Sequence, residues 1–307
     1  MPDYLNELIE RLWLYRDRRF SDRPNVFLDQ RRLPNRPPVF RNEFADLNVV
    51  APAPHRQAIL ETLRIADRHD WFSSMRSSQA LTQSVFGTLK VLDKLHLLSR
   101  VMADDGGPAF FLDAPPPSEC LLENKCTFLG ELPDRETKSD VFFGGRQKIS
   151  VECKLAEDAF GSCSQPALAP TSSNYGRDIC DGSYSRQRAR RERCSLTEKG
   201  ILYWEKIPGV LTWDAEVDHP ECPLRFPYQL VRNLLAAESG QAVLVYDSHN
   251  PLFQRGGACA ECFETVRNAL HDERRLRRCS WQTICGILAH DSDLHDFVEE
   301  LKLKFGF

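Results

Sequence analysis

Two short apolar runs on either side of Gly144-Gly145 constrain the fold of this chain more than any other feature. Apolar runs that flank a glycine pair predict a β-hairpin. Side chains alternate along a strand, so Glu152 and Lys154 share one face of the second run. A three-residue loop at Gly145–Gln147 places Asp140 of the first run opposite Glu152. The sequence therefore predicts two carboxylates and one ammonium group on one surface.

This set of charges has a known chemical use. Two carboxylates hold Mg²⁺, a hard cation that also accepts water and phosphate oxygens. The pattern Asp140, eleven residues, then Glu152-Cys153-Lys154 resembles the PD-(D/E)xK nuclease superfamily, with Ser139 where that superfamily often has proline. The resemblance implies metal binding by Asp140, Glu152 and the carbonyl of Cys153, with Lys154 supporting the attacking water. The competing interpretation is a solvated charge pair, since Glu-x-Lys is frequent on exposed strands.

Composition sets wider limits. The chain has 307 residues, 42% hydrophobic and 27% charged, which suits one large or two small globular domains. No apolar run approaches membrane-spanning length, and the N-terminus does not resemble a secretion signal. Eleven cysteines without such a signal favour a reducing, cytoplasmic location. The net charge of −4 does not indicate nucleic-acid binding, although a nuclease needs only a local basic surface.

The expected elements support the same interpretation. In chain order we expect helices at 3–16 and 54–68, a longer helix from the cap Ser77-Ser78 to about 98, a strand at 121–130, the hairpin, an irregular insertion at 156–222, a helix at 227–237, a strand at 242–246 and a helical remainder whose last helix is capped by Asp291. The middle of this series is the core order of the restriction-endonuclease-like fold, an α/β fold with a mixed central sheet flanked by helices.

Several local motifs also resemble a bacterial restriction-endonuclease-like family over roughly residues 75–260. They are Ser77-Ser78-Gln79-Ala80, Glu152–Glu157 followed by Phe160-Gly161, Tyr228–Asn233 and Asp247–Pro251. We divide the chain accordingly into an N-terminal helical and extended arm at 1–70, a nuclease core at 71–257 and a C-terminal helical extension at 258–307.

The insertion at 156–222 has few apolar residues with which to bury a core of its own. It contains four cysteines that predict a structural metal site, either Zn²⁺ or an iron–sulfur cluster: Cys163, Cys180, Cys194 and Cys222. The alternative is that they are small buried residues. The pair Cys259 and Cys262 has the spacing of one helical turn and is a weaker candidate.

The remaining candidates are polar side chains around the hairpin. The first core helix offers Gln79 and Gln83 at the rim of the metal site, and Glu131 and Glu157 are further acids whose simpler interpretation is a solvated loop. Phosphate contacts are expected from these residues: Arg186, Arg188, Arg190, Arg191, Arg193, Gln229 and Arg232.

The sequence favours a Mg²⁺-dependent (or Mn²⁺-dependent) nuclease, a DNA endonuclease of restriction or defence type that acts on double-stranded DNA. We expect no membrane partner, and a homodimer is one option for the assembly. One alternative is a non-catalytic nucleic-acid-binding module with a structural zinc or iron–sulfur site. Another is a redox protein built around its cysteines.

Overall fold

The computed structural model describes residues 2–29, 31–33, 35–112, 119–133, 136–167, 180–186 and 190–307. Its helices are α1 (Pro2–Arg19), α2 (Arg56–Leu60), α3 (Ser78–Thr82), α4 (Thr88–Val91), α5 (Ser195–Glu198), α6 (Tyr203–Lys206), α7 (Tyr228–Ala236), α8 (Ala258–Asn268), α9 (Trp281–Leu288) and α10 (His295–Phe305). Its strands are β1 (Glu119–Cys126), β2 (Thr137–Gly144), β3 (Ile149–Cys153), β4 (Gln241–Tyr246) and β5 (Leu276–Ser280).

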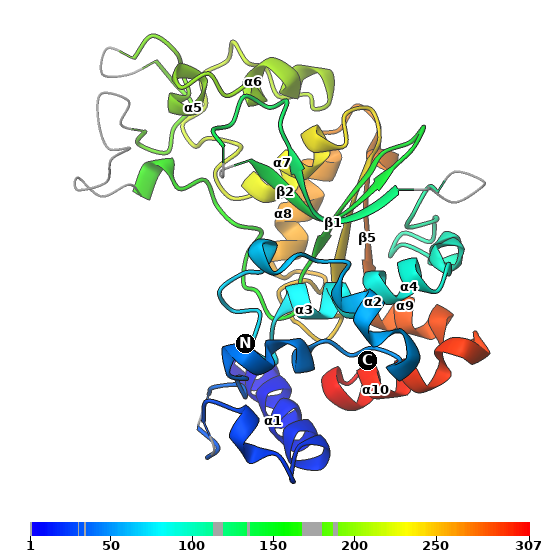
Figure 1. Ribbon diagram of the computed structural model, residues 1–307. Helices are drawn as coiled ribbons and strands as arrows, with labels where there is room; N and C mark the ends of the chain where they lie inside the picture. Colours follow the sequence, from blue (N-terminus) through cyan, green and yellow to red (C-terminus); the bar gives the residue numbers. More distant parts are fainter. Residues whose placement is uncertain are drawn as a thin grey trace.

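The strands form one mixed sheet in the order β1-β2-β3-β4-β5. The first three strands are antiparallel, while β4 lies parallel to β3 and β5 lies parallel to β4. Helices flank the sheet, and α1 and α10 lie at the end opposite α5 and α6 (Figure 1). The predicted α/β core of restriction-endonuclease type is thus present.

Alternation along the strands divides the core between the two sheet faces. Val243 and Val245 of β4 pack in a cluster with α1, α3, α4, α9 and α10. Leu244 and Tyr246 of the same strand pack on the other side, with α7, α8 and part of the insertion. Burial on both faces explains why β4 reads as one continuous apolar run.

The first core helix is shorter and less regular than predicted. Ser77 caps it as expected, since its hydroxyl accepts a bond from the N–H of Ala80 at 3.2 Å. Residues 83–87 then form a π-helical turn, and the α-helix ends at Val91 rather than near residue 98. At the turn the Ser84 hydroxyl donates to the carbonyl of Ala80 at 2.7 Å, a bond that locally disturbs helix geometry.

The predicted helix at 54–68 was wrong in extent, because only Arg56–Leu60 is α-helical. The Gln83 side chain donates to the carbonyls of Ile59 and Leu60 at 3.0 and 2.9 Å, and so caps the end of α2. The Thr62 hydroxyl also donates to the Ile59 carbonyl. Ile65, an apolar residue inside the predicted helix, is 78% exposed.

The expectation of a wholly helical C-terminal region was also wrong, since β5 lies within it. Its Leu-Arg-Arg-Cys-Ser sequence does not read as a strand because two arginines stand in the middle. Arg277 pairs with Asp105, and Arg278 pairs with Asp104 at 2.9 Å. These acids neutralise the arginines and let the strand add to the parallel side of the sheet.

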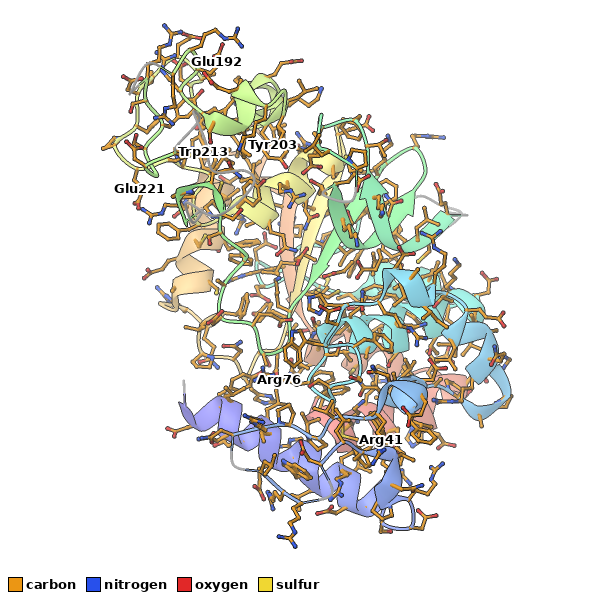
Figure 2. All side chains as sticks on the ribbon, turned by 60° about the vertical axis from the view of Figure 1, so that its left-hand side comes forward. Arg41, Arg76, Glu192, Tyr203, Trp213 and Glu221 are labelled. Carbon is orange, nitrogen blue, oxygen red and sulfur yellow. The ribbon has the colours of Figure 1, made fainter. Side chains whose placement is uncertain are left out.

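The insertion has more core than its composition predicted. From residue 194 onward it places Leu196, Tyr203, Trp204 and Ile207 in the cluster that also holds α7 and α8. Figure 2 shows Tyr203 on the side of the insertion nearer the sheet and Glu221 on the outer side. This part of the insertion is therefore anchored to the body by aromatic side chains.

The other helical predictions agree with the structure. Helices α7 and α10 each bury an apolar face, formed by Leu230, Val231, Leu234 and Leu235 in α7 and by Phe297, Val298, Leu301 and Phe305 in α10. Asp291 caps the turn just before α10 by accepting from the N–H of Asp293 at 3.0 Å. The domain boundaries near residues 70 and 257 stay predictions. Across the described residues, every helix is too short or too polar to cross a lipid bilayer.

Candidate active site

The hairpin between β2 and β3 has the predicted register. Val141 pairs with Val151 and Phe142 pairs with Ser150, so Asp140 stands opposite Glu152 across the ladder. Asp140 also accepts a hydrogen bond from the backbone N–H of Cys153 at 2.6 Å. The structure thus brings together the acid before the turn and the Glu-x-Lys motif after it.

Glu152 and Lys154 are both buried and form an ion pair at 2.8 Å. The second Glu152 oxygen accepts from the Asn233 amide of α7 at 2.6 Å. The Lys154 ammonium group also donates to Gln229 of α7 at 3.0 Å. Helix α7 therefore fixes both charged side chains, which is not the arrangement of a solvated surface pair.

Gly161 explains part of the Phe160-Gly161 motif. Its φ of +71° lies in the left-handed region that favours glycine. A Cβ at this position would lie 3.1 Å from the Gln229 side-chain oxygen, the atom that accepts from Lys154. The glycine therefore lets the chain pass close to Gln229 without displacing it.

The pKa shifts at the site follow from burial and from like charges. Burial raises the pKa of Asp140 well above its usual range, and the nearby carboxylates of Glu152 and Glu123 raise it further. Burial lowers the pKa of Lys154, but the negative charges of Glu152, Glu157 and Asp140 outweigh it and raise the pKa overall. Lys154 is therefore a firmly held cation, while the carboxylates repel one another.

A third carboxylate, which the sequence did not predict, belongs to this cluster, that of Glu123 on β1. The β1–β2 register places Glu123 across from Asp140, because Leu122 pairs with Val141 and Asn124 with Ser139. Burial raises the pKa of Glu123, and a 2.6 Å hydrogen bond from Gln79 opposes that rise. Gln79 therefore contacts this carboxylate cluster through Glu123, while its place at the rim of a metal site stays a prediction. A glutamate in the middle of an otherwise half-apolar strand was the available signal.

The ends of β3 and β4 are tied to the N-terminal helix. The Tyr4 hydroxyl lies 2.7 Å from the Leu155 carbonyl and 2.8 Å from Asp247. Trp281 donates to the carbonyl of Lys154 at 2.9 Å. Figure 2 shows Arg76 in the region between α1 and the sheet. These contacts from distant parts of the chain hold the strand end that carries Lys154.

The donor set fits a hard divalent cation. Carboxylate oxygens are the preferred ligands of Mg²⁺, and a cation would relieve the repulsion that raises the pKa of Asp140. As the side chains of the described residues stand, no three Cys, His, Asp or Glu groups are arranged to hold a metal ion by themselves. Backbone, water or substrate oxygens would complete the coordination, as is usual for Mg²⁺.

Four other candidates lie in different surroundings. Gln83 is buried against α2. The Glu131 side chain is only 3% exposed and pairs with Arg232 at 2.6 Å, so it is not a solvated loop acid. Arg232 also donates to Thr137 at 2.8 Å. Glu157 accepts from the N–H groups of Leu155 and Ala156 at 2.6 and 2.9 Å and closes the turn after β3.

The arginines between residues 186 and 193 of the insertion differ in their surroundings: some are paired within the protein and others are exposed. Arg190 is 8% exposed and donates to the carbonyl of Ser185 at 2.8 Å. Arg193 bridges Asp218 at 2.6 Å and Glu216 at 3.4 Å. Arg186 and Arg191 are exposed, whereas Arg188 lies outside the described residues. Among the described residues of this run, Arg186 and Arg191 are therefore the exposed candidates for the predicted phosphate contacts.

Comparison with known proteins identifies a family. Residues 28–306 match the model of a family described as "Restriction Endonuclease associating with ARP". No curated protein and no solved structure matches the chain. The matched region covers most of the chain, beyond the 75–260 segment expected from local motifs, and the family's description suggests a nuclease-like role that involves nucleic acid. The chain thus belongs to the family of restriction endonucleases associating with ARP.

Proposed function

We propose that this protein is a Mg²⁺-dependent nuclease that hydrolyses phosphodiester bonds in double-stranded DNA. The observation that carries the proposal is the convergence of Asp140, Glu152 and Lys154 on neighbouring strands of a restriction-endonuclease-like sheet. The raised pKa of Asp140 supports it, because clustered carboxylates with strongly shifted pKa values are typical of functional sites.

In this proposal Asp140 and Glu152 hold the metal, and the carbonyl of Cys153 is a third ligand. When bound, Mg²⁺ stabilises charge on the scissile phosphate and lowers the pKa of a coordinated water. Glu123, across the ladder from Asp140, lies where it can hold a further water or a second ligand position. Gln79 orients Glu123 through its 2.6 Å hydrogen bond.

Lys154 has the role of positioning the attacking water and offsetting negative charge on the phosphate. Among the described residues its ammonium group contacts Glu152 at 2.8 Å and Gln229 at 3.0 Å, and we assign its third N–H donor to substrate or water. Asn233 keeps Glu152 oriented from the other side. Because α7 carries both Gln229 and Asn233, it acts as the support for the catalytic groups.

The proposal is tested by incubating the purified protein with supercoiled plasmid and with linear DNA, with Mg²⁺ or with EDTA. We expect cleavage that requires Mg²⁺ and that is lost in Asp140→Asn. A matched control is Asp158→Asn, since Asp158 is an exposed acid outside the cluster. Cleavage that persists in EDTA contradicts the proposal. Tight DNA binding without cleavage favours the non-catalytic alternative.

A further inference from the structure

The four cysteines of the insertion come from separate segments of the chain and approach one another. The Cys222 thiol lies within electrostatic range of Cys194, Cys163 and Cys180. Cys163 lies within range of Cys194 and Cys180 as well, and Cys194 within range of Cys180. All four thiols therefore lie in one region of the fold, although they are as far as 59 positions apart in the sequence.

Backbone hydrogen bonds join three of these segments. The N–H of Cys163 donates to the Arg225 carbonyl at 2.8 Å, and the N–H of Arg225 donates to the Cys222 carbonyl at 2.9 Å. The N–H of Cys222 donates to the Gly182 carbonyl at 2.8 Å, next to Cys180. The fourth segment is attached through Arg193, which bridges Asp218 and Glu216. These contacts fix the region around the thiols from several directions.

Each thiol also has a backbone donor that follows it closely in the chain. The N–H of Gly182 donates to the sulfur of Cys180 at 3.4 Å. Burial raises the pKa of Cys163, Cys194 and Cys222. Backbone hydrogen bonds oppose that rise, from Gln165 to Cys163, from Leu196 and Thr197 to Cys194, and from Leu224 to Cys222. N–H groups directed at sulfur stabilise thiolates, the form in which cysteine binds metal.

We propose that Cys163, Cys180, Cys194 and Cys222 form a structural Zn²⁺ site once their thiols move together around the ion. Four thiolates are the ligand set of a closed, tetrahedral zinc site. Each thiol would release its proton to solvent on binding, and the binding free energy would stabilise a segment whose helices α5 and α6 span only four residues each. As the described side chains stand, the four thiols are not arranged to hold a metal ion. Zinc binding would therefore require the sulfur atoms to move closer together.

None of the eleven cysteines forms a disulfide, so no cross-link competes for these four thiols. The site lies in the insertion, whereas the carboxylates of the candidate active site lie on β1, β2 and β3. The inference therefore stands apart from the proposed nuclease activity, and the two can fail separately.

The test is elemental analysis of the full chain purified without chelator under anaerobic conditions. We expect about one zinc ion per chain. Replacing any one of the four with serine should reduce the bound zinc at least fivefold. Cys262→Ser serves as the matched control, because Cys262 is a partly buried cysteine on α8 and should leave the zinc content unchanged.

Cobalt substitution of the wild-type chain gives a second measurement that does not depend on whether the variants fold. Tetrahedral thiolate coordination should give intense visible absorption that zinc displaces. Protein with zinc but without DNA cleavage would contradict only the proposed function. Folded protein with neither zinc nor iron, or with several irons and a brown colour, would overturn the zinc site.

Discussion

At the scale of single residues, the candidate site concentrates negative charge where water is scarce. Glu152 on β3 is only 2% exposed, Asp140 lies on the adjacent strand β2, and Glu123 lies on β1 on the far side of β2. Burial and mutual repulsion raise the pKa of Asp140, so the ionised cluster costs folding free energy when no cation offsets it. Such a cost is typical of functional sites, where activity and stability compete.

One consequence is that replacing Asp140 should stabilise the protein but abolish its activity. Asp140→Asn keeps the shape of the side chain and removes one repelling charge, so the free energy of unfolding without added metal should rise by about 1 kcal/mol at neutral pH. Cleavage should disappear. Thermal unfolding in EDTA measures the first effect, with Asp158→Asn as the control that changes neither quantity. A lower free energy of unfolding in Asp140→Asn than in the wild type would show that the ionised Asp140 carboxylate does not destabilise the fold.

Lys304 predicts a pH dependence of stability far from the candidate site. It is buried and donates to the carbonyl and the side-chain oxygen of Asn48 at 2.6 and 2.8 Å. Burial lowers its pKa to about 7, with Glu300 opposing the shift and Arg56 adding to it. Below that pKa the folded state must bury a charge, so stability rises between pH 7 and the ordinary lysine value near 10.4.

The expected gain from pH 7 to pH 9 is about 2 kcal/mol of unfolding free energy attributable to this group. Lys304→Met should remove that increment, while Lys302→Met, at a lysine whose side chain is 40% exposed, should retain it. Urea unfolding of the wild type, Lys304→Met and Lys302→Met at pH 7 and pH 9 measures the difference in unfolding free energy. Parallel pH dependences in wild type and Lys304→Met would mean that Lys304 titrates normally.

At the scale of elements, the hairpin was predictable because its information is local. Strand alternation, a glycine pair and a short loop fix the register that sets Asp140 against Glu152. The first core helix was less predictable, because its π turn and early end depend on partners distant in the chain, such as the bond from the Val50 N–H to Ser84. β5 was missed because Asp104 and Asp105 neutralise its arginines only in the folded state.

The exposed arginines of the insertion allow a test of whether this segment contacts DNA. Arg186 and Arg191 are exposed on the segment that precedes Cys194, and guanidinium groups suit phosphate binding. Replacing both with glutamine should weaken DNA binding and flatten its salt dependence by about 0.9 in log–log slope for each phosphate that the variant no longer binds. The control is Arg274→Gln, at an arginine whose side chain is 74% exposed. An unchanged slope would identify the run as a solvated face.

At the scale of the whole molecule, the site depends on interactions that no sequence window contains. Tyr4 of α1 lies against the Leu155 carbonyl, Trp281 of α9 binds the Lys154 carbonyl, and Asn233 of α7 binds Glu152. The sequence predicted the fold class and the placement of Asp140 opposite Glu152, but not these supports or Glu123. They come from elements whose relation to the hairpin is set only by tertiary packing.

The most direct test of the central claim is the single-turnover rate of Mg²⁺-dependent plasmid cleavage by Lys154→Met beside the wild type. If Lys154 acts on the nucleophile or the charged phosphate, the rate should fall by about 10²-fold or more while DNA affinity stays within about twofold. Asp158→Asn should cleave at the wild-type rate. A Lys154→Met protein that is folded and cleaves at the wild-type rate would contradict the assignment of this hairpin as the catalytic centre.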